Sequence, residues 1–108
     1  MTTTTLVRYR VRPGREDRNA ELVRDVYREL HALEPQGFAY ATYRLADGTF
    51  VHIAETADGT AAPLPGLAAF GRFREGLAER CAEPPVSAAA ERVGAYGHGE
   101  REPAALSG

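Results

Sequence analysis

Two segments rich in aromatic and β-branched residues, 38–45 and 49–56, flank an Ala-Asp-Gly sequence at 46–48. Aromatic and β-branched side chains favour strands, and Asp-Gly is typical of the tight turn that joins two antiparallel strands. The sequence therefore predicts a β-hairpin over residues 38–56. This hairpin constrains the fold strongly, because strand side chains alternate between two faces and one residue of register decides which face each occupies.

The expected register places Tyr43 opposite His52. A two-residue turn at Asp47-Gly48 and a four-residue loop both lead to this pairing, whereas a bulge would break it. Tyr43 and His52 then share one face with Phe50, and the Cβ atoms of the opposed pair lie about 5 Å apart. A phenol and an imidazole at that distance can share a hydrogen bond or a ligand.

The rest of the chain supplies two helices and two more strands. Apolar residues recur at three- and four-residue steps over 15–33, which predicts an amphipathic helix. The same spacing over 67–81 predicts a second helix, ended by the proline pair at 84–85. Residues 6–11 and 91–97 are predicted to form the first and fourth strands.

The order β-α-β-β-α-β is that of the ferredoxin-like, split βαβ arrangement, an α+β fold. We expect a four-stranded antiparallel sheet with two helices on one face. Tyr9, Tyr40, Val51 and Ile53 are expected on the uncovered face, which would be more apolar than the surface of a typical monomer. The sequence thus predicts a homodimer formed by apposing two open sheet faces.

Length and composition set the class of protein. The 108 residues fit one domain, expected over 1–98, with a flexible C-terminal tail at 99–108. The net charge of −2, with acids and bases interspersed, lacks the basic stripe that nucleic acid binding requires. No stretch is apolar enough to span a membrane and no signal peptide is recognisable, so we expect a cytoplasmic protein.

Cysteine and histidine usage indicates no metal centre. Cys81 is the only cysteine, which excludes an internal disulfide and a cysteine-rich metal site. The three histidines lack ligand spacing. We therefore expect neither a metal nor another cofactor.

Over residues 6–97 the chain resembles the dimeric α+β barrel superfamily, in particular antibiotic biosynthesis monooxygenase-like (ABM) domains. The resemblance rests on the element order and on three sequences: VRPG at 11–14, EPQGF at 34–38 and FVHIAET at 50–56. It implies a sheet-to-sheet dimer and a small cavity between helices and sheet. It also implies several activities, since some members oxygenate aromatic polyketides without metal or flavin, some degrade haem, and many have no assigned activity.

The sequence departs from the catalytic sets of that family. Active members commonly use a tryptophan near the end of the third strand, an asparagine in the sheet, or a histidine on the second helix. This chain has no tryptophan, and Ala57 stands two residues after Glu55. Its only asparagine is Asn19 on the first predicted helix, and the second has no histidine. A function must therefore be argued from the residues that are present.

Tyr43 and His52 are the candidate catalytic residues. An imidazole that titrates at about pH 6.5 is a suitable base for a phenolic proton, and Tyr43 would orient the base or the substrate. The alternative is that the pair only packs across two strands, with each polar group satisfied by the other or by the backbone. Strand alternation leaves open which face meets the helices, and the opposite choice places both residues in the dimer interface.

The residues expected to line the pocket are Phe50, Phe70, Phe73, Glu55 and Arg74. Phe70 and Phe73 lie at helical spacing and would either form the floor of an aromatic-binding pocket or fill the core. Arg74 would pair with Glu55 or with an anionic ligand, although exposed pairs of this kind contribute little.

Two functions from different classes are consistent with these features. One is a cofactor-independent monooxygenase of the ABM type, acting on a small aromatic or polyketide-like substrate. The other is a non-catalytic small-ligand-binding or interaction protein that retains the dimeric barrel fold.

Overall fold

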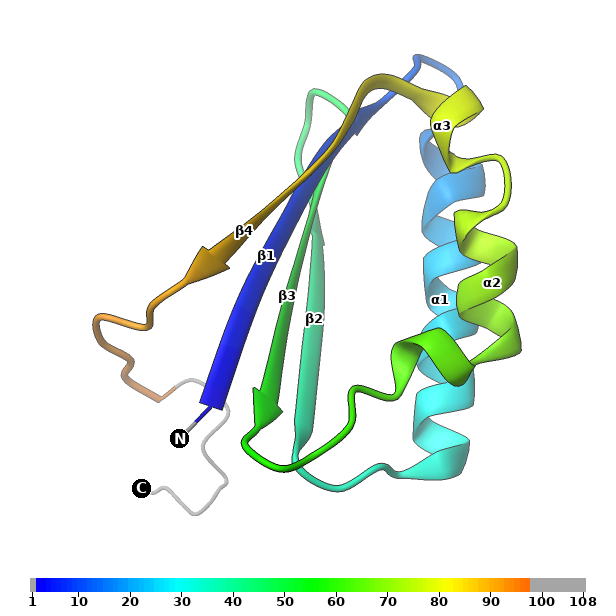
Figure 1. Cartoon of the computed structure of the whole chain (residues 1–108). Helices are drawn as coiled ribbons and strands as arrows, with labels where there is room; N and C mark the ends of the chain where they lie inside the picture. The colour runs from blue at the N-terminus through cyan, green and yellow to red at the C-terminus, as the bar shows by residue number, and fades with distance from the viewer. Residues whose placement is uncertain (1, 98–108) are drawn as a thin grey trace.

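A computed structural model describes residues 2–97 of the chain (Figure 1). The predicted tail at 99–108 lies outside the described residues. The elements, in chain order, are β1 (Thr2–Val11), α1 (Glu16–Leu33), β2 (Phe38–Arg44), β3 (Thr49–Ala57), a 3₁₀ turn (Leu64–Gly66), α2 (Ala68–Arg74), α3 (Leu77–Arg80) and β4 (Cys81–Ala90).

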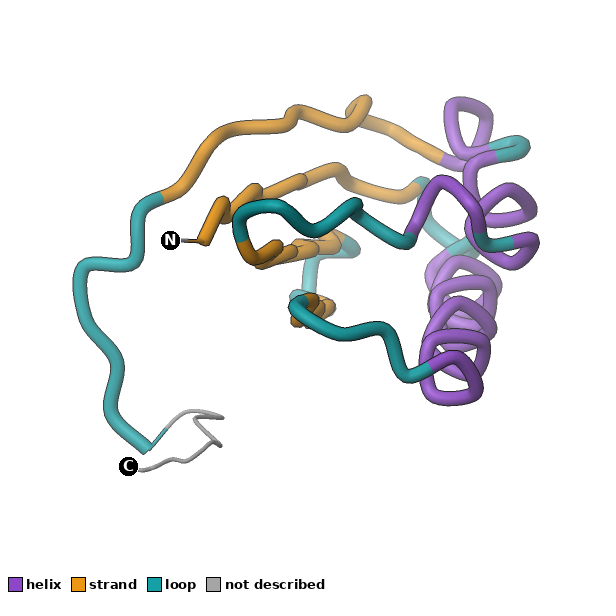
Figure 2. Tube along the Cα trace, turned by 60° about the horizontal axis from the view of Figure 1, so that its bottom comes forward, coloured by secondary structure: helices purple, strands orange, loops and turns teal. Residues whose placement is uncertain are grey.

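The strands form one antiparallel sheet in the order β2-β3-β1-β4, so β3 and β1 are central. The helices of the described residues all lie on one face of this sheet and leave its other face without a helix (Figures 1 and 2). The predicted ferredoxin-like α+β fold is therefore confirmed. No helix within residues 2–97 has both the length and the apolar character needed to cross a membrane.

Helix α1 forms where the apolar spacing predicts it, and it buries Leu22, Val23, Val26 and Leu30. It ends at Glu34, which adopts a left-handed conformation and donates its backbone N–H to the Leu30 carbonyl at 2.8 Å. The capping bond satisfies a carbonyl that the end of the helix would otherwise leave without a partner.

The second predicted helix, 67–81, is wrong in its extent. Helix α2 stops at Arg74, Glu75 is extended, and Gly76 has a φ of 76° before α3 begins at Leu77. Glycine adopts this left-handed conformation at no steric cost, so the chain turns sharply here despite the continuing apolar spacing.

The fourth strand is also misplaced in the sequence-based prediction. Strand β4 covers 81–90 and runs through Pro84 and Pro85, whereas 91–97 is not a strand. The prolines are tolerated because β4 is an edge strand and because the register shifts there, so that both stand opposite Tyr9.

The hairpin between β2 and β3 forms with a register one residue away from the expected one. Its loop has three residues, closed by a bond from the Leu45 N–H to the Thr49 carbonyl at 2.8 Å. Gly48 has a φ of 88° and donates to the Leu45 carbonyl, which is the geometry of a turn followed by a glycine bulge. His52 consequently pairs with Thr42 rather than with Tyr43.

The register decides which side chains meet the helices. His52 and Phe50 are buried beneath them, whereas Tyr43 pairs with Val51 and is 47% exposed. The prediction that Tyr43 and His52 share a face is therefore wrong. Tyr9 and Tyr40, expected on the uncovered face, instead pack against the core under the helices.

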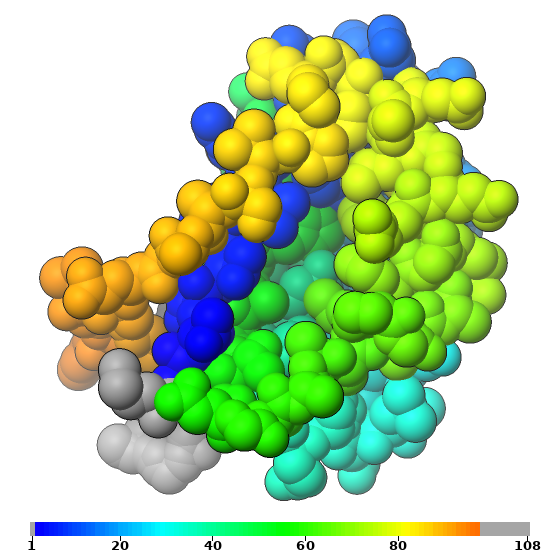
Figure 3. Space-filling model, in the orientation of Figure 1, coloured from blue at the N-terminus to red at the C-terminus, as the bar shows by residue number. Residues whose placement is uncertain are grey.

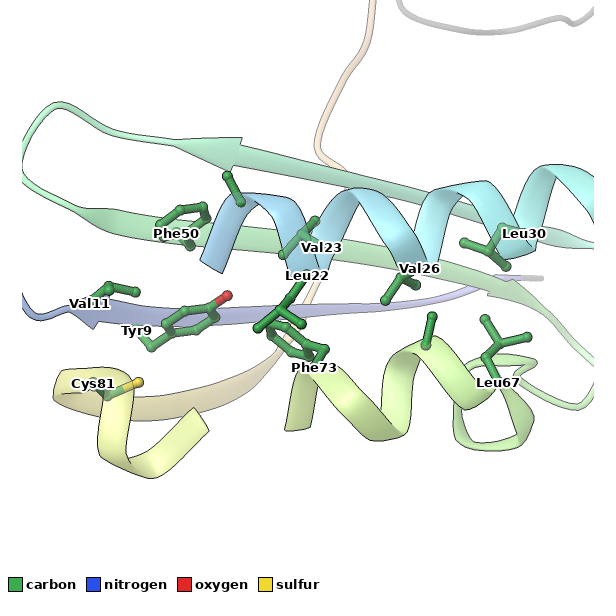
Figure 4. Packing of buried hydrophobic residues seen from close by; sticks show 12 residues of the cluster. Tyr9, Val11, Leu22, Val23, Val26, Leu30, Phe50, Leu67, Phe73 and Cys81 are labelled. Atoms are coloured by element: carbon green, nitrogen blue, oxygen red, sulfur yellow. The ribbon is translucent and has the colours of Figure 1, made fainter. Parts of the chain in front are cut away.

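The core fills the space between the sheet and the helices (Figure 4). The Tyr9 ring stacks on Phe50 with centroids 5.7 Å apart, and the ring of Phe73 lies 6.2 Å from Tyr9. The buried apolar residues are Tyr9, Val11, Ala20, Leu22, Val23, Val26, Leu30, Phe50, Leu67, Ala69, Phe73 and Cys81.

Replacing Gly48 and Gly71 by alanine should change stability in opposite directions. Gly48 is left-handed and its added Cβ would lie 3.3 Å from the Val11 carbonyl oxygen, so Gly48→Ala should lower the free energy of unfolding by about 1–3 kcal/mol. Gly71 lies inside α2 with open space around it, so Gly71→Ala should raise it by about 0.5–1 kcal/mol. Urea unfolding at pH 7.5 measures both changes, and a stable Gly48→Ala would contradict the bulged loop.

Candidate functional site

His52 lies in the middle of β3 and projects between the sheet and the helices, where only 5% of its surface is exposed. Both ring nitrogens have partners. Nε2 lies 2.8 Å from the Tyr9 hydroxyl of β1, and Nδ1 lies 2.8 Å from the Tyr40 hydroxyl and 3.0 Å from Thr42 Oγ1, both of β2. One imidazole thus links three strands of the sheet.

The hydrogen bonds continue from both sides of the imidazole into the helices. Asn19 of α1 donates from Nδ2 to the Tyr9 hydroxyl at 2.9 Å, and Arg80 of α3 donates from Nε to Asn19 Oδ1 at 3.1 Å. On the other side, the hydroxyls of Tyr27 and Thr42 lie 2.8 Å apart. We refer to the connected residues as the His52 network: Arg80, Asn19, Tyr9, His52, Tyr40, Thr42 and Tyr27.

Arg80 is a buried cation, 6% exposed, and both of its terminal nitrogens donate to backbone carbonyls. It donates to the Phe73 carbonyl at 2.7 Å and to the Glu75 carbonyl at 3.2 Å, and its guanidinium carbon lies 5.6 Å from the Phe73 ring centroid. These carbonyls stand at the end of α2, where intrahelical donors run out. The left-handed Gly76 therefore turns the chain so that Arg80 completes the end of the preceding helix.

Burial keeps the titratable rings of the network neutral. It lowers the pKa of His52 to about 4 and raises the pKa values of Tyr9 and Tyr40 above those of free phenols. Burial also lowers the pKa of Arg80, but a guanidinium remains charged in proteins. Near neutral pH the network therefore holds one formal charge, at its Arg80 end.

Aromatic rings surround the imidazole. Its centroid lies 5.4 Å from Tyr9, 5.6 Å from Phe73 and 5.8 Å from Tyr40. The Tyr40 ring in turn stacks with Tyr27 at 5.3 Å and with Phe38 at 5.8 Å.

Half-buried apolar side chains flank the buried core between the sheet and the helices. Core residues are buried at both ends of the interface, Val11 and Cys81 at one end and Leu30 and Leu67 at the other. The half-buried residues packed against this core are Val7, Tyr27, Phe38, Tyr40, Leu64, Phe70 and Leu77. Figure 3 shows the surface hollowed between β1 and the α2 region. The stacked rings of Tyr27, Tyr40 and Phe38 form the half-buried aromatic part of the interface, and the buried His52 contacts it through Tyr40.

The structure brings together only some of the residues predicted to form the site. Phe50 and Phe73 are buried near His52. Phe70 is half-buried, and the centroid of its ring lies 5.9 Å from the guanidinium carbon of Arg74. Glu55 lies elsewhere, on the uncovered face. It is bonded to Arg92 at 2.7 Å, so the expected pair of Glu55 with Arg74 is not the one that forms.

The uncovered face, which we call the open face, carries a separate groove of about 610 Å³. Tyr43 belongs to this groove, together with Leu6, Ala41, Ile53 and the chain segment after β4. Within residues 2–97 no three His, Cys, Asp or Glu side chains gather in a way that would hold a metal ion.

The sequence-based prediction missed Tyr9, Asn19 and Arg80 as neighbours of His52. A signal for Asn19 was present, because this polar residue takes a place in the apolar stripe of α1 ahead of Val23 and Val26. Nothing in the local pattern pointed to Arg80, which is brought inward by the turn at Gly76.

No protein-family model matches the sequence, and no curated protein matches it either. Solved structures do match. A protein described as "Putative antibiotic biosynthesis monooxygenase from Nitrosomonas europaea" is 18% identical with a TM-score of 0.69, over 85% of this chain and 90% of that one.

Two more neighbours agree on the fold. A conserved protein from Methanosarcina mazei Go1 is 14% identical with a TM-score of 0.68, covering 84% of this chain and 92% of that one. A protein named antibiotic biosynthesis monooxygenase is 20% identical with a TM-score of 0.66, covering 87% of this chain and all of its own, 100%. The chain therefore has the α+β fold of proteins named as antibiotic biosynthesis monooxygenases.

The buried His52 should make stability fall in mild acid. Its native pKa of about 4 lies below the value of 6.5 expected for the unfolded chain, so only the unfolded state gains a proton between these values. This contribution is fully present above pH 6.5 and is lost as the pH falls toward 4. Between pH 7.5 and 4.5 the native protein should lose about 2–3 kcal/mol more of its free energy of unfolding than His52→Gln does.

Urea unfolding across this pH range gives the comparison, and His31→Gln is the matched control. His31 is exposed near the end of α1, so that variant should follow the native protein. Equal pH dependence in the native protein and in His52→Gln would contradict a neutral, buried imidazole.

Proposed function

We propose that the chain is a cofactor-independent monooxygenase of the ABM type that acts on a small aromatic or polyketide-like substrate beside His52. One observation carries this proposal. A buried neutral imidazole, bonded to two tyrosine hydroxyls, stands where the fully buried core gives way to half-buried aromatic rings. Such a place offers stacking surfaces for an aromatic ring and polar groups for its oxygen.

The substrate would enter from the half-buried part of the interface and stack against Tyr40 and Phe38. Its phenol or enol oxygen would take a place on the Nδ1 side of His52, next to the Tyr40 and Thr42 hydroxyls. Hydrogen bonds from neutral donors stabilise negative charge on that oxygen well when water is excluded. The site would thereby favour the substrate anion, which is the form rich enough in electrons to react with oxygen.

The proposed oxygenation needs O₂ as its only co-substrate. After the substrate loses a proton, a ring carbon of the anion transfers electrons to O₂ and forms a carbon–oxygen bond, giving a hydroperoxide. Loss of water from the hydroperoxide leaves a carbonyl, so a CH₂ group becomes C=O, and the second oxygen atom leaves as H₂O. The substrate supplies all the electrons, so no external reductant is needed.

A specific observation favours the alternative of a non-catalytic small-ligand-binding or interaction protein with this fold. Both His52 nitrogens are already bonded inside the network, which would hold β1, β2 and β3 together without any substrate. The low pKa of His52 also makes it a weak base. Turnover therefore decides between the two functions.

We also propose that two copies associate through their open faces. Leu6, Ala41, Ile53 and Tyr43 line the groove on that face, and none of the helices within residues 2–97 covers it. Apposing two such faces would remove this apolar surface from water in a symmetric contact.

Oxygen uptake with a panel of dihydroxynaphthalenes and anthrones tests the proposed activity. We expect the native protein to consume oxygen and form a quinone from at least one of them. Tyr40→Phe removes a hydroxyl at His52 and should reduce kcat by about 10- to 100-fold. Tyr43→Phe, the same change three residues further along β2 but on the open face, should retain the native rate. Absence of uptake with the whole panel would favour the non-catalytic function.

Light scattering after size exclusion at micromolar concentration tests the dimer. The native protein should have about twice the 11.7 kDa mass of one chain. Ile53→Lys places a charge in the groove on the open face and should yield monomers, because a buried unpaired charge is costly. Leu33→Lys is the control, since Leu33 is 59% exposed at the end of α1, away from the sheet. A native protein with the mass of a single chain would refute the contact.

A further inference from the structure

The direction of the hydrogen bonds in the His52 network can be worked out from its charged end. Arg80 carries only donors, so the Asn19 atom that its Nε contacts at 3.1 Å must be the amide oxygen. The amide nitrogen of Asn19 then faces Tyr9 and donates to its hydroxyl oxygen at 2.9 Å. The guanidinium thus removes the ambiguity that an asparagine amide normally has.

The donor in the hydrogen bond between Tyr9 and His52 follows from the partners of the Tyr9 hydroxyl. Tyr9 is 2% exposed and its hydroxyl oxygen already accepts from Asn19. If Tyr9 donates to Nε2, its proton has a partner. If Nε2 were protonated and donated instead, the Tyr9 proton would be left with no acceptor among the contacts of the described residues. Buried polar groups rarely remain unpaired, so Tyr9 is the donor to Nε2.

We propose that Arg80 and Asn19 are positioning residues that hold His52 in the tautomer with its proton on Nδ1. From Arg80 to β2, every hydrogen bond of the His52 network then has its donor on the Arg80 side. Arg80 donates to Asn19, Asn19 to Tyr9, Tyr9 to Nε2, and Nδ1–H to the hydroxyls of β2. The fixed positive charge at the start polarises each bond in that same direction.

This tautomer gives His52 a definite role in catalysis, a role that rests on the proposed function. Toward the half-buried aromatic part of the interface the imidazole presents an N–H donor, and its lone pair is occupied by Tyr9 on the opposite side. A bound phenol or enol would replace a β2 hydroxyl as the acceptor of this N–H, so that His52 would stabilise its oxyanion by donating a hydrogen bond. The substrate proton would leave to water, so His52 would not serve as the base.

Tyr40 would donate a second hydrogen bond to the same substrate oxygen. Its hydroxyl is 2.8 Å from Nδ1 and the residue is half-buried, so its own proton stays available to a second acceptor. The substrate class that fits is an acidic phenol or enol, whose anion accepts two hydrogen bonds at one oxygen.

The experiment is ¹⁵N–¹H correlation spectroscopy of the imidazole at pH 7.5, with no substrate present. Two-bond couplings distinguish the ring nitrogen that carries the proton from the one that does not. We expect the native protein to show His52 with Nε2 unprotonated, opposite to the tautomer that free imidazole side chains prefer in water. A native His52 protonated at Nε2 overturns the inference without any variant.

Asn19→Asp is the sharpest variant, because it changes one NH₂ to an oxygen. The carboxylate would accept from both Arg80 and the Tyr9 hydroxyl, so Tyr9 would accept from His52 and the proton should move to Nε2. Asp17→Asn, the reverse exchange on the same helix at an exposed position paired with Arg44, should leave the tautomer on Nδ1. A folded Asn19→Asp that keeps the native tautomer would refute the role of Asn19.

The spectrum separates this inference from the proposed function. If His52 carries its proton on Nδ1 but the protein consumes no oxygen, the inferred tautomer is supported and the oxygenase function is refuted. An active protein whose His52 is protonated at Nε2 overturns the tautomer alone.

Discussion

The hydrogen bond between Tyr9 and His52 joins the two central strands at the place where the helices meet the sheet. Both groups are buried, so each must find its remaining partners inside the protein. Asn19 of α1 and Arg80 of α3 supply those partners on one side, and the β2 hydroxyls supply them on the other. The positions of α1, α3 and β2 are therefore all coupled to one chain of bonds through the core.

This arrangement explains why the second helical region is broken. A continuous helix over 67–81 would leave no turn at Gly76 and would carry Arg80 along its own axis rather than into the core. With the break, Arg80 satisfies two carbonyls near the end of α2 and also orients Asn19. The charge is tolerated inside the protein because three carbonyl oxygens surround it, one of the side chain and two of the backbone.

The local patterns of the sequence predicted α1 and the hairpin well, because apolar spacing and turn residues act over a few positions. They failed where a single glycine or an edge position changed the outcome. The bulge at Gly48 shifted the register by one residue and separated Tyr43 from His52. The proline pair at 84–85 is typical of a helix end, but here it lies in a strand, which tolerates it because that strand is at the edge of the sheet.

The sequence by itself determined the order of elements, the α+β class and the presence of an amphipathic histidine in the third strand, since these depend on residue types and their spacing. Only the tertiary structure decided that His52 faces the helices and that its partners are Tyr9, Tyr40 and Thr42. The physical reason is that the partners of a buried polar group come from residues distant in the chain. Strand register and the turns decide which of these residues meet, and a shift of one residue in a strand replaces all the side chains that face the core.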